Sequence, residues 1–153
     1  MLDVAIVIFT GIVIAVVSSW ITVQLSLRKF RSERWWERKA ETYSRIIEAL
    51  HNSKAFADTY LEAESEGREL EKKDKELLRQ RSEAAHEEIS KAMDIGAFLL
   101  SNKAQARLKQ YQKEAEQAGQ QQSWFEYLDA DWAATDKCLN DMIEIAKHDL
   151  RTK

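Results

Sequence analysis

The sequence predicts an all-α protein with one N-terminal transmembrane helix, a long antiparallel helical hairpin and two further helices that complete a helical bundle. Two observations support this prediction. The 153 residues include no proline and only four glycines, and helix-forming residues such as Ala, Glu, Lys and Leu are abundant. The apolar residues form one uncharged run at the start and stripes at helical spacing afterwards. We therefore divide the chain into an anchor, residues 1–28, and a helical bundle, residues 29–153.

The uncharged run extends over residues 4–27 and reads VAIVIFTGIVIAVVSSWITVQLSL. About 24 residues form a helix of about 36 Å, which is long enough to cross a hydrocarbon core of about 30 Å. A cleaved signal peptide fits poorly, because no Lys or Arg precedes residue 28 and no small-x-small cleavage site precedes the basic cluster. We therefore expect a single span that anchors the chain in a membrane.

The charges on either side of this run predict its orientation. Asp3 precedes the run, and the basic stretch RKFRSERWWER follows it at residues 28–38. Positive residues stay on the cytoplasmic side, so the N-terminus is expected outside and the bundle in the cytoplasm. Basic and aromatic side chains suit the lipid headgroup region. The residues expected there are Arg28, Lys29, Arg31, Arg34 and Trp35.

Small residues recur on one face of the expected span. They are Gly11, Ala15, Ser18 and Thr22, at three- and four-residue spacing. Small side chains allow two helices to approach closely in lipid, so this face is predicted to mediate self-association. The same hydroxylated stripe could line a pore of several copies. No charged residue lies within the span, so no proton relay or charged filter is visible.

The predicted hairpin occupies about residues 32–100. Its first arm, about 32–64, has Trp36, Tyr43, Leu50 and Ala57 at seven-residue intervals, which predicts one buried stripe. Gly67 in the connector is the expected left-handed residue after the helix end. The second arm, about 70–100, is expected to bury residues that include Leu77. Because neither glycine nor proline separates the span from the first arm, the sequence leaves open whether they form one helix.

Two further helices are expected at about 102–118 and 123–150. Ser101 is the expected N-cap of the first, and Ser123-Trp124-Phe125-Glu126 matches a capping box at the start of the second. We expect the aromatic residues of this last helix to cover the core beside Phe98. They also form the candidate partner surface, which consists of Trp124, Tyr127 and Trp132.

Two Glu-x-x-His pairs are candidate metal ligands. Glu48 with His51, and Glu83 with His86, have the spacing found in ferritin-like di-iron bundles. Ligands in such bundles point inward, whereas helical projection places these four side chains mostly away from the apolar stripes. We therefore expect no metal and no cofactor.

Other chemical patterns are absent from the sequence. Cys138 is the single cysteine, so it cannot form an intrachain disulfide, and its place on an apolar stripe favours a core position. There is no zinc pattern and no glycine-rich phosphate loop. A net charge of −3, with acids and bases interspersed, does not favour nucleic acid. No small-molecule substrate is evident, and the chain is not expected to be an enzyme.

The stretch RKFRSERWWERKAETYSRIIEALH, with the later segments GAFLLS and WFEYLDAD, resembles small bacterial proteins that have a single membrane span and a helical cytoplasmic region. The resemblance covers most of the chain. It implies a bacterial inner-membrane setting, and it implies neither an activity nor any functional residue.

The function expected from the sequence is that of a membrane-anchored helical scaffold or adaptor, which oligomerises, recruits a partner protein, or does both at the cytoplasmic face. Its partners would be the lipid bilayer and either a second copy or another protein. The alternative is a small oligomeric pore or membrane-acting effector gated by its bundle. A metal-dependent enzyme is the third class.

Overall fold

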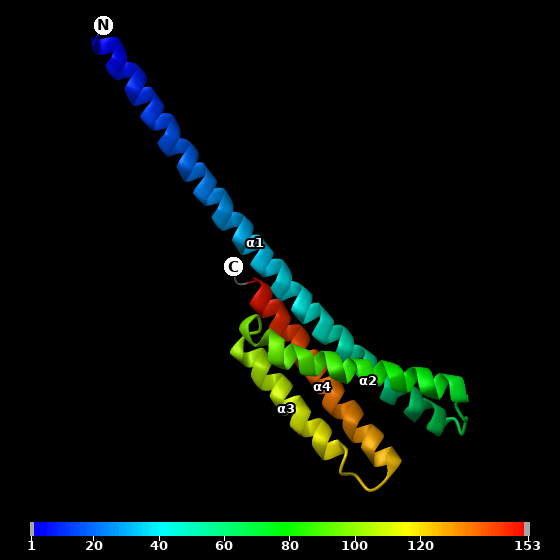
Figure 1. Ribbon diagram of the computed structural model, residues 1–153. Helices are drawn as coiled ribbons and strands as arrows, with labels where there is room; N and C mark the ends of the chain where they lie inside the picture. The colour runs from blue at the N-terminus through cyan, green and yellow to red at the C-terminus, as the bar shows by residue number, and fades with distance from the viewer. Residues whose placement is uncertain (1, 152–153) are drawn as a thin grey trace. The chain divides into compact units, whose positions relative to one another are not determined.

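A computed structural model describes the backbone of residues 2–151 and the side chains within that range except those of residues 2–17, 28, 95 and 97. The described chain consists of the helices α1 (Leu2–Ser65), α2 (Lys72–Ile95), α3 (Asn102–Ala118) and α4 (Trp124–Arg151), with the 3-10 turn η1 (Gly96–Phe98) between α2 and α3 (Figure 1). No strand occurs within residues 2–151, so the predicted all-α class is confirmed.

The chain divides into two compact units, residues 1–37 and residues 38–153. The first unit contains only the N-terminal part of α1. The expected span and the expected first arm belong to the same helix, because α1 is unbroken from Leu2 to Ser65. The absence of glycine and proline between residues 12 and 66 explains why no break occurs there.

The membrane span expected at residues 4–27 is not supported by the part of the chain that the structure describes. Among those residues, no helix combines the length and the apolar character that crossing a membrane requires. Side chains are described from Ser18 onward, so residues 4–17 of the expected span lie outside them.

The second unit is a four-helix bundle in which successive helices run in opposite directions. Arg45 of α1 and Glu88 of α2 line two adjoining hollows, of which one also contains Asn52 and Arg81 and the other Thr42 and Lys91. Residue numbers therefore rise along α1 as they fall along α2, which makes these two helices antiparallel. Figure 1 shows the same antiparallel course for α1 and α2 and for α3 and α4. The predicted hairpin is therefore present, although its second arm, α2, ends at Ile95 and is followed by η1.

All four helices contribute to one core. The buried side chains share an apolar character and helical spacing, and they exclude water from the centre of the bundle. From α1 to α4 they are Tyr43, Ile46, Ala49, Leu50, Ala85, Ile89, Leu100, Ala104, Leu108, Tyr111, Ala134, Cys138, Met142, Ile145 and Ala146.

The helix ends follow the local signals of the sequence. After α1, the backbone N–H of Arg68 donates to the carbonyl of Ala63 at 2.9 Å, and Gly67 has a φ of 63°, as in a Schellman C-cap. Ser101 caps α3 by accepting a hydrogen bond from the N–H of Ala104 at 3.3 Å. Ser123 and Glu126 form the reciprocal capping box at 3.1 and 3.3 Å. These three predictions are confirmed.

Three predictions about buried aromatic and aliphatic residues were wrong. Trp36 is 40 % exposed and precedes the bundle, whose core on α1 begins at Tyr43. Leu77 is 45 % exposed because the core on α2 begins two turns later, at Ala85. Phe98 and Trp124 do not meet, because the chain after Phe98 caps α3 near Tyr43, whereas Trp124 packs against Tyr60.

Candidate partner-binding surface

Four aromatic side chains gather where α4 begins beside the C-terminal part of α1. Phe56 and Tyr60 come from α1, with ring centroids 4.8 Å apart. Trp124 meets Tyr60 edge-on at 5.6 Å and stacks on Tyr127 at 5.2 Å. We call Phe56, Tyr60, Trp124 and Tyr127 the aromatic cluster. Such contacts fix the orientation of Trp124, although its side chain is 53 % exposed.

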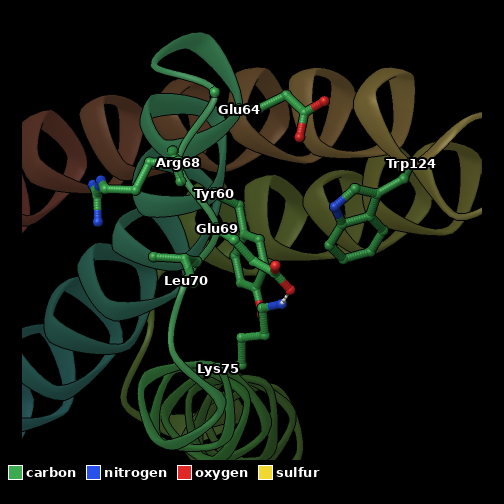
Figure 2. A pocket seen from close by; sticks show the side chains of 9 residues that line it. Tyr60, Glu64, Arg68, Glu69, Leu70, Lys75 and Trp124 are labelled. Carbon is green, nitrogen blue, oxygen red and sulfur yellow. Dashed lines mark hydrogen bonds and ion pairs between the residues drawn. The ribbon is translucent and has the colours of Figure 1, made fainter.

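An open pocket of about 380 Å³ adjoins the aromatic cluster. Figure 2 shows Tyr60 from α1 and Trp124 from α4 on its wall, together with Arg68, Glu69 and Leu70 from the connector. The connector charges are paired, since Arg68 contacts Glu66 at 3.1 Å and Glu69 contacts Lys75 of α2 at 3.2 Å. The pocket therefore offers aromatic surface inside a rim whose charges are largely balanced.

Trp132 lies partly buried at the seam between α1 and α4. Its indole N–H donates to the Asp58 carboxylate at 2.5 Å, and the Lys54 ammonium lies 5.0 Å above its ring centroid. Lys54 in turn pairs with Asp136 at 2.7 Å, which raises its pKa. Of the predicted surface residues, Trp124 is exposed, Tyr127 is partly buried in the aromatic cluster, and Trp132 holds two helices together.

The predicted self-association face lies only in part within the described side chains. Gly11 and Ala15 are outside them, whereas Ser18 and Thr22 are exposed. The Thr22 hydroxyl donates to the Ser18 carbonyl at 2.9 Å, so its hydrogen bond is made within its own helix.

The expected headgroup residues are exposed where they are described. Lys29 pairs with Glu33 at 3.9 Å, and the Arg34 guanidinium lies 5.0 Å from the centroid of the Phe30 ring. Arg31 and Trp35 are exposed as well, and the side chain of Arg28 lies outside the described set. These contacts leave cationic and aromatic groups at the surface of the first unit.

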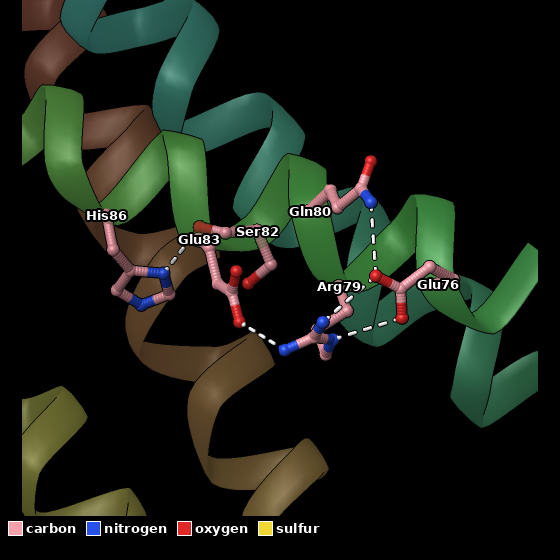
Figure 3. Close-up of polar contacts among 6 residues, drawn as sticks. All are labelled: Glu76, Arg79, Gln80, Ser82, Glu83 and His86. Carbon is pink, nitrogen blue, oxygen red and sulfur yellow. Dashed lines mark hydrogen bonds and ion pairs between the residues drawn. The ribbon is translucent and has the colours of Figure 1, made fainter.

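Neither Glu-x-x-His pair belongs to a metal site in the part of the chain that the structure describes. No group of three possible ligands occurs there. Glu83 binds Arg79 at 2.9 Å, and His86 Nδ1 lies 2.8 Å from the Ser82 carbonyl in an exposed network on α2 (Figure 3). Glu48 and His51 are both exposed on α1.

Cys138 lies in the core, as its place on the apolar stripe predicted, and burial raises its pKa to about 12. A thiol with so high a pKa is a weak nucleophile at neutral pH. Arg107, also buried, lies between Asp141 at 2.7 Å and Glu114 at 3.1 Å. This arrangement is an ion-pair network between α3 and α4, not a reactive site.

Sequence reasoning missed half of the aromatic cluster. Phe56 and Tyr60 are four residues apart on α1, which is the spacing that places two rings side by side on a helix. That signal was available, but the position of Trp124 against this pair depends on how α1 and α4 pack.

No family model, curated protein or solved structure matches this chain. Its function is therefore argued from its own residues.

Proposed function

We propose that this chain is a membrane-anchored scaffold or adaptor. A helix formed by residues 4–27 holds it in a bacterial inner membrane with the N-terminus outside, and the bundle recruits a partner protein at the cytoplasmic face. The proposal involves no chemical step and no cofactor.

One observation on α1 gives the main support for the membrane anchor. Large apolar side chains at neighbouring positions of α1 are all exposed, and at 100° per residue they point to several sides of the helix. One packed helix could cover only one side, whereas lipid covers all of them. These side chains are Trp20 at 65 %, Ile21 at 48 %, Val23 at 54 %, Leu25 at 61 % and Leu27 at 45 % exposure.

The sequence on both sides of these residues supports the same proposal. Residues 4–17 continue the uncharged run without a charged residue. Lys29, Arg31 and Arg34 follow it, and cationic side chains next to a span attract anionic headgroups.

Trp124 supports the recruitment of a partner. Exposed tryptophans that are held in place and adjoin a pocket are typical of binding hot spots, because a large rigid side chain loses little entropy on contact. Confinement to the membrane plane would raise the effective concentration of two anchored proteins, so a modest contact at this surface would suffice.

The anchor is tested by flotation of the full chain with vesicles of phosphatidylcholine and phosphatidylglycerol. We expect the wild-type chain to float and the Ile14→Arg/Val17→Arg variant to remain below, because each arginine costs about 2.5–3.5 kcal/mol at the centre of a span. Ser44→Arg/Gln112→Arg, which alters two exposed positions of the bundle, is the matched control and should float. A wild-type chain that stays below would contradict the anchor.

Recruitment is tested by the mass of the complex purified from the host membrane in nanodiscs, with every co-purifying chain identified. We expect a second protein at fixed stoichiometry, lost in Trp124→Ala and retained in Phe98→Ala, which truncates a more exposed aromatic residue elsewhere. Unchanged recovery with Trp124→Ala would contradict the surface. A homo-oligomer of four or more copies would favour the pore, and Ser18→Leu should then abolish ion flux.

A further inference from the structure

A groove follows the seam between α1 and α2 on the surface of the bundle. It consists of two adjoining hollows of about 360 and 300 Å³, which share Arg45 and Glu88. Small residues line its floor among charged residues, and small side chains permit the backbone of another helix to approach closely. They are Ala49, Ala84, Ala85, Ala92 and Gly96.

The rim of this groove carries charges of both signs that lack partners across the seam. Among the described residues, Arg81 and Glu48 make no ion pair, and Glu88 is attracted only by Lys91 of its own helix. Lys91 also lines the groove and pairs with Glu87 at 2.7 Å. Arg45 pairs only with Glu41 of its own helix, and both side chains are more than half exposed. Such an exposed pair contributes little, so Arg45 can exchange Glu41 for another carboxylate.

We propose that this α1–α2 groove is the interface of a homodimer, with a second copy of this chain docked on it about a two-fold axis parallel to the seam. The proposal deepens the proposed scaffold and rests on it only for the confinement of both chains to one membrane. A two-fold axis is the commonest symmetry of a pair of identical chains.

The charges of the groove complement themselves under this symmetry. The rotation places α1 of one copy opposite α2 of the other and keeps every residue at its height along the seam. Because α1 and α2 are antiparallel, Arg45 lies level with Glu88, and Ala49 lies level with Ala84 and Ala85. Arg45 therefore faces the partner's Glu88, and alanine faces alanine between them.

The second charged pair is close to the same level. Asn52 lies level with Arg81, and Glu48 is one helical turn, about 6 Å, from that level. Long side chains span such an offset, so Glu48 can reach the partner's Arg81. Each pair occurs twice in the dimer, and all four contacts join opposite charges.

The experiment measures energy transfer between donor-labelled and acceptor-labelled full chains in vesicles of phosphatidylcholine and phosphatidylglycerol, at rising protein-to-lipid ratio. We expect a dimer for the wild-type chain. Arg81→Glu should weaken it on the order of tenfold or more, because two attractions become two repulsions. Arg81→Glu/Glu48→Arg should restore it, because the swap recreates both pairs.

Lys113→Glu, which reverses an exposed charge on α3, is the control and should leave dimerisation unchanged. Thermal unfolding of each variant excludes loss of the fold. Wild-type chains that bind vesicles but remain monomeric would overturn the dimer and leave the anchor intact. Normal dimerisation of the Arg81→Glu chain would do the same, and so would a double variant whose dimerisation does not recover. Chains that dimerise with the expected rescue but do not bind vesicles would overturn the anchor alone.

Discussion

Two lengths of the same helix differ in how their apolar side chains are covered. Between residues 38 and 65, α1 buries Tyr43, Ile46 and Leu50, each at most 1 % exposed, at three- and four-residue spacing. Between residues 18 and 37, apolar side chains at adjacent positions, such as Trp20 and Ile21, are all exposed. Helical spacing lets a chain bury its own stripe, whereas the apolar side chains between residues 18 and 37 point to several sides and are not buried in this way.

The largest test of this contrast truncates one leucine in each region. Leu50, between residues 38 and 65 of α1, is fully buried, so Leu50→Ala should lower the free energy of unfolding of the bundle by about 2–5 kcal/mol. Leu25→Ala removes an exposed side chain and should change it by less than about 0.5 kcal/mol. Urea unfolding of the full chain in detergent, followed by circular dichroism, measures both. Equal losses would remove the distinction between the two regions.

A polar contact between Tyr43 in the middle of α1 and Asp149 near the end of α4 provides the next test. The Tyr43 hydroxyl donates to the Asp149 carboxylate at 2.5 Å, and burial, followed by this bond, raises the pKa of Tyr43 to about 12. Tyr43→Phe should cost about 1–3 kcal/mol of unfolding free energy at pH 7. Tyr60→Phe is the control, since no hydrogen bond to the Tyr60 hydroxyl occurs among the described residues.

The loss from Tyr43→Phe should depend on pH. Burial acts to raise the pKa of Asp149, but hydrogen bonds from Ser101, Tyr43 and His148 outweigh it and lower the pKa. A lowered carboxyl pKa contributes stability above its unfolded value, and this contribution disappears as the pH falls through the folded value. The difference in unfolding free energy between Tyr43→Phe and the wild-type chain should therefore become smaller at acidic pH. A difference in unfolding free energy that stays constant with pH would show that the hydrogen bond to Asp149 does not account for the stability lost in Tyr43→Phe.

A buried acid inside the bundle should have the opposite pH dependence. Asp131 is 3 % exposed, and burial raises its pKa, which nearby His86 lowers only in part. Its ionisation costs stability as the pH rises above the unfolded value of about 3.9. At pH 7, Asp131→Asn should raise the melting temperature by a few degrees, which corresponds to about 1 kcal/mol of unfolding free energy. Near pH 3 it should have no effect. Asp129→Asn, at an exposed position, should have no effect at either pH.

The smallest expected effect concerns the turn after α1. Gly67 has a φ of 63°, which an alanine adopts at a cost of about 1 kcal/mol, although no atom would clash with its Cβ. Gly119 ends α3 with an ordinary φ of −63°, so Gly119→Ala should be neutral or slightly stabilising. Thermal unfolding of the two variants compares them directly. A neutral Gly67→Ala would contradict the proposed role of the left-handed conformation.

Features that depend on a few neighbouring residues were predictable from the sequence. The caps at Ser101 and Ser123 and the turn at Gly67 follow from chemistry within three or four positions. The burial of Trp36 and Leu77 was predicted wrongly, because periodicity identifies a stripe but not where along a helix its neighbours begin and end.

Contacts between distant segments were not predictable. Arg107 is buried because Asp141, 34 residues later, faces it from α4. Trp132 donates a hydrogen bond to Asp58, 74 residues away, and no spacing in the sequence predicts this contact. The same limit applies to the α1–α2 groove, since the level of Glu48 relative to Arg81 depends on the register of the hairpin.

The central claim is that residues 4–27 cross a membrane and leave the bundle on its cytoplasmic side. Its most direct test is labelling of single cysteines with a membrane-impermeant maleimide, in a Cys138→Ser background. The account predicts that Asp3→Cys is labelled only from outside intact cells, Ser44→Cys only in inverted vesicles, and Ile14→Cys in neither. Labelling of Ile14→Cys, or of Asp3→Cys and Ser44→Cys from the same side, would contradict it.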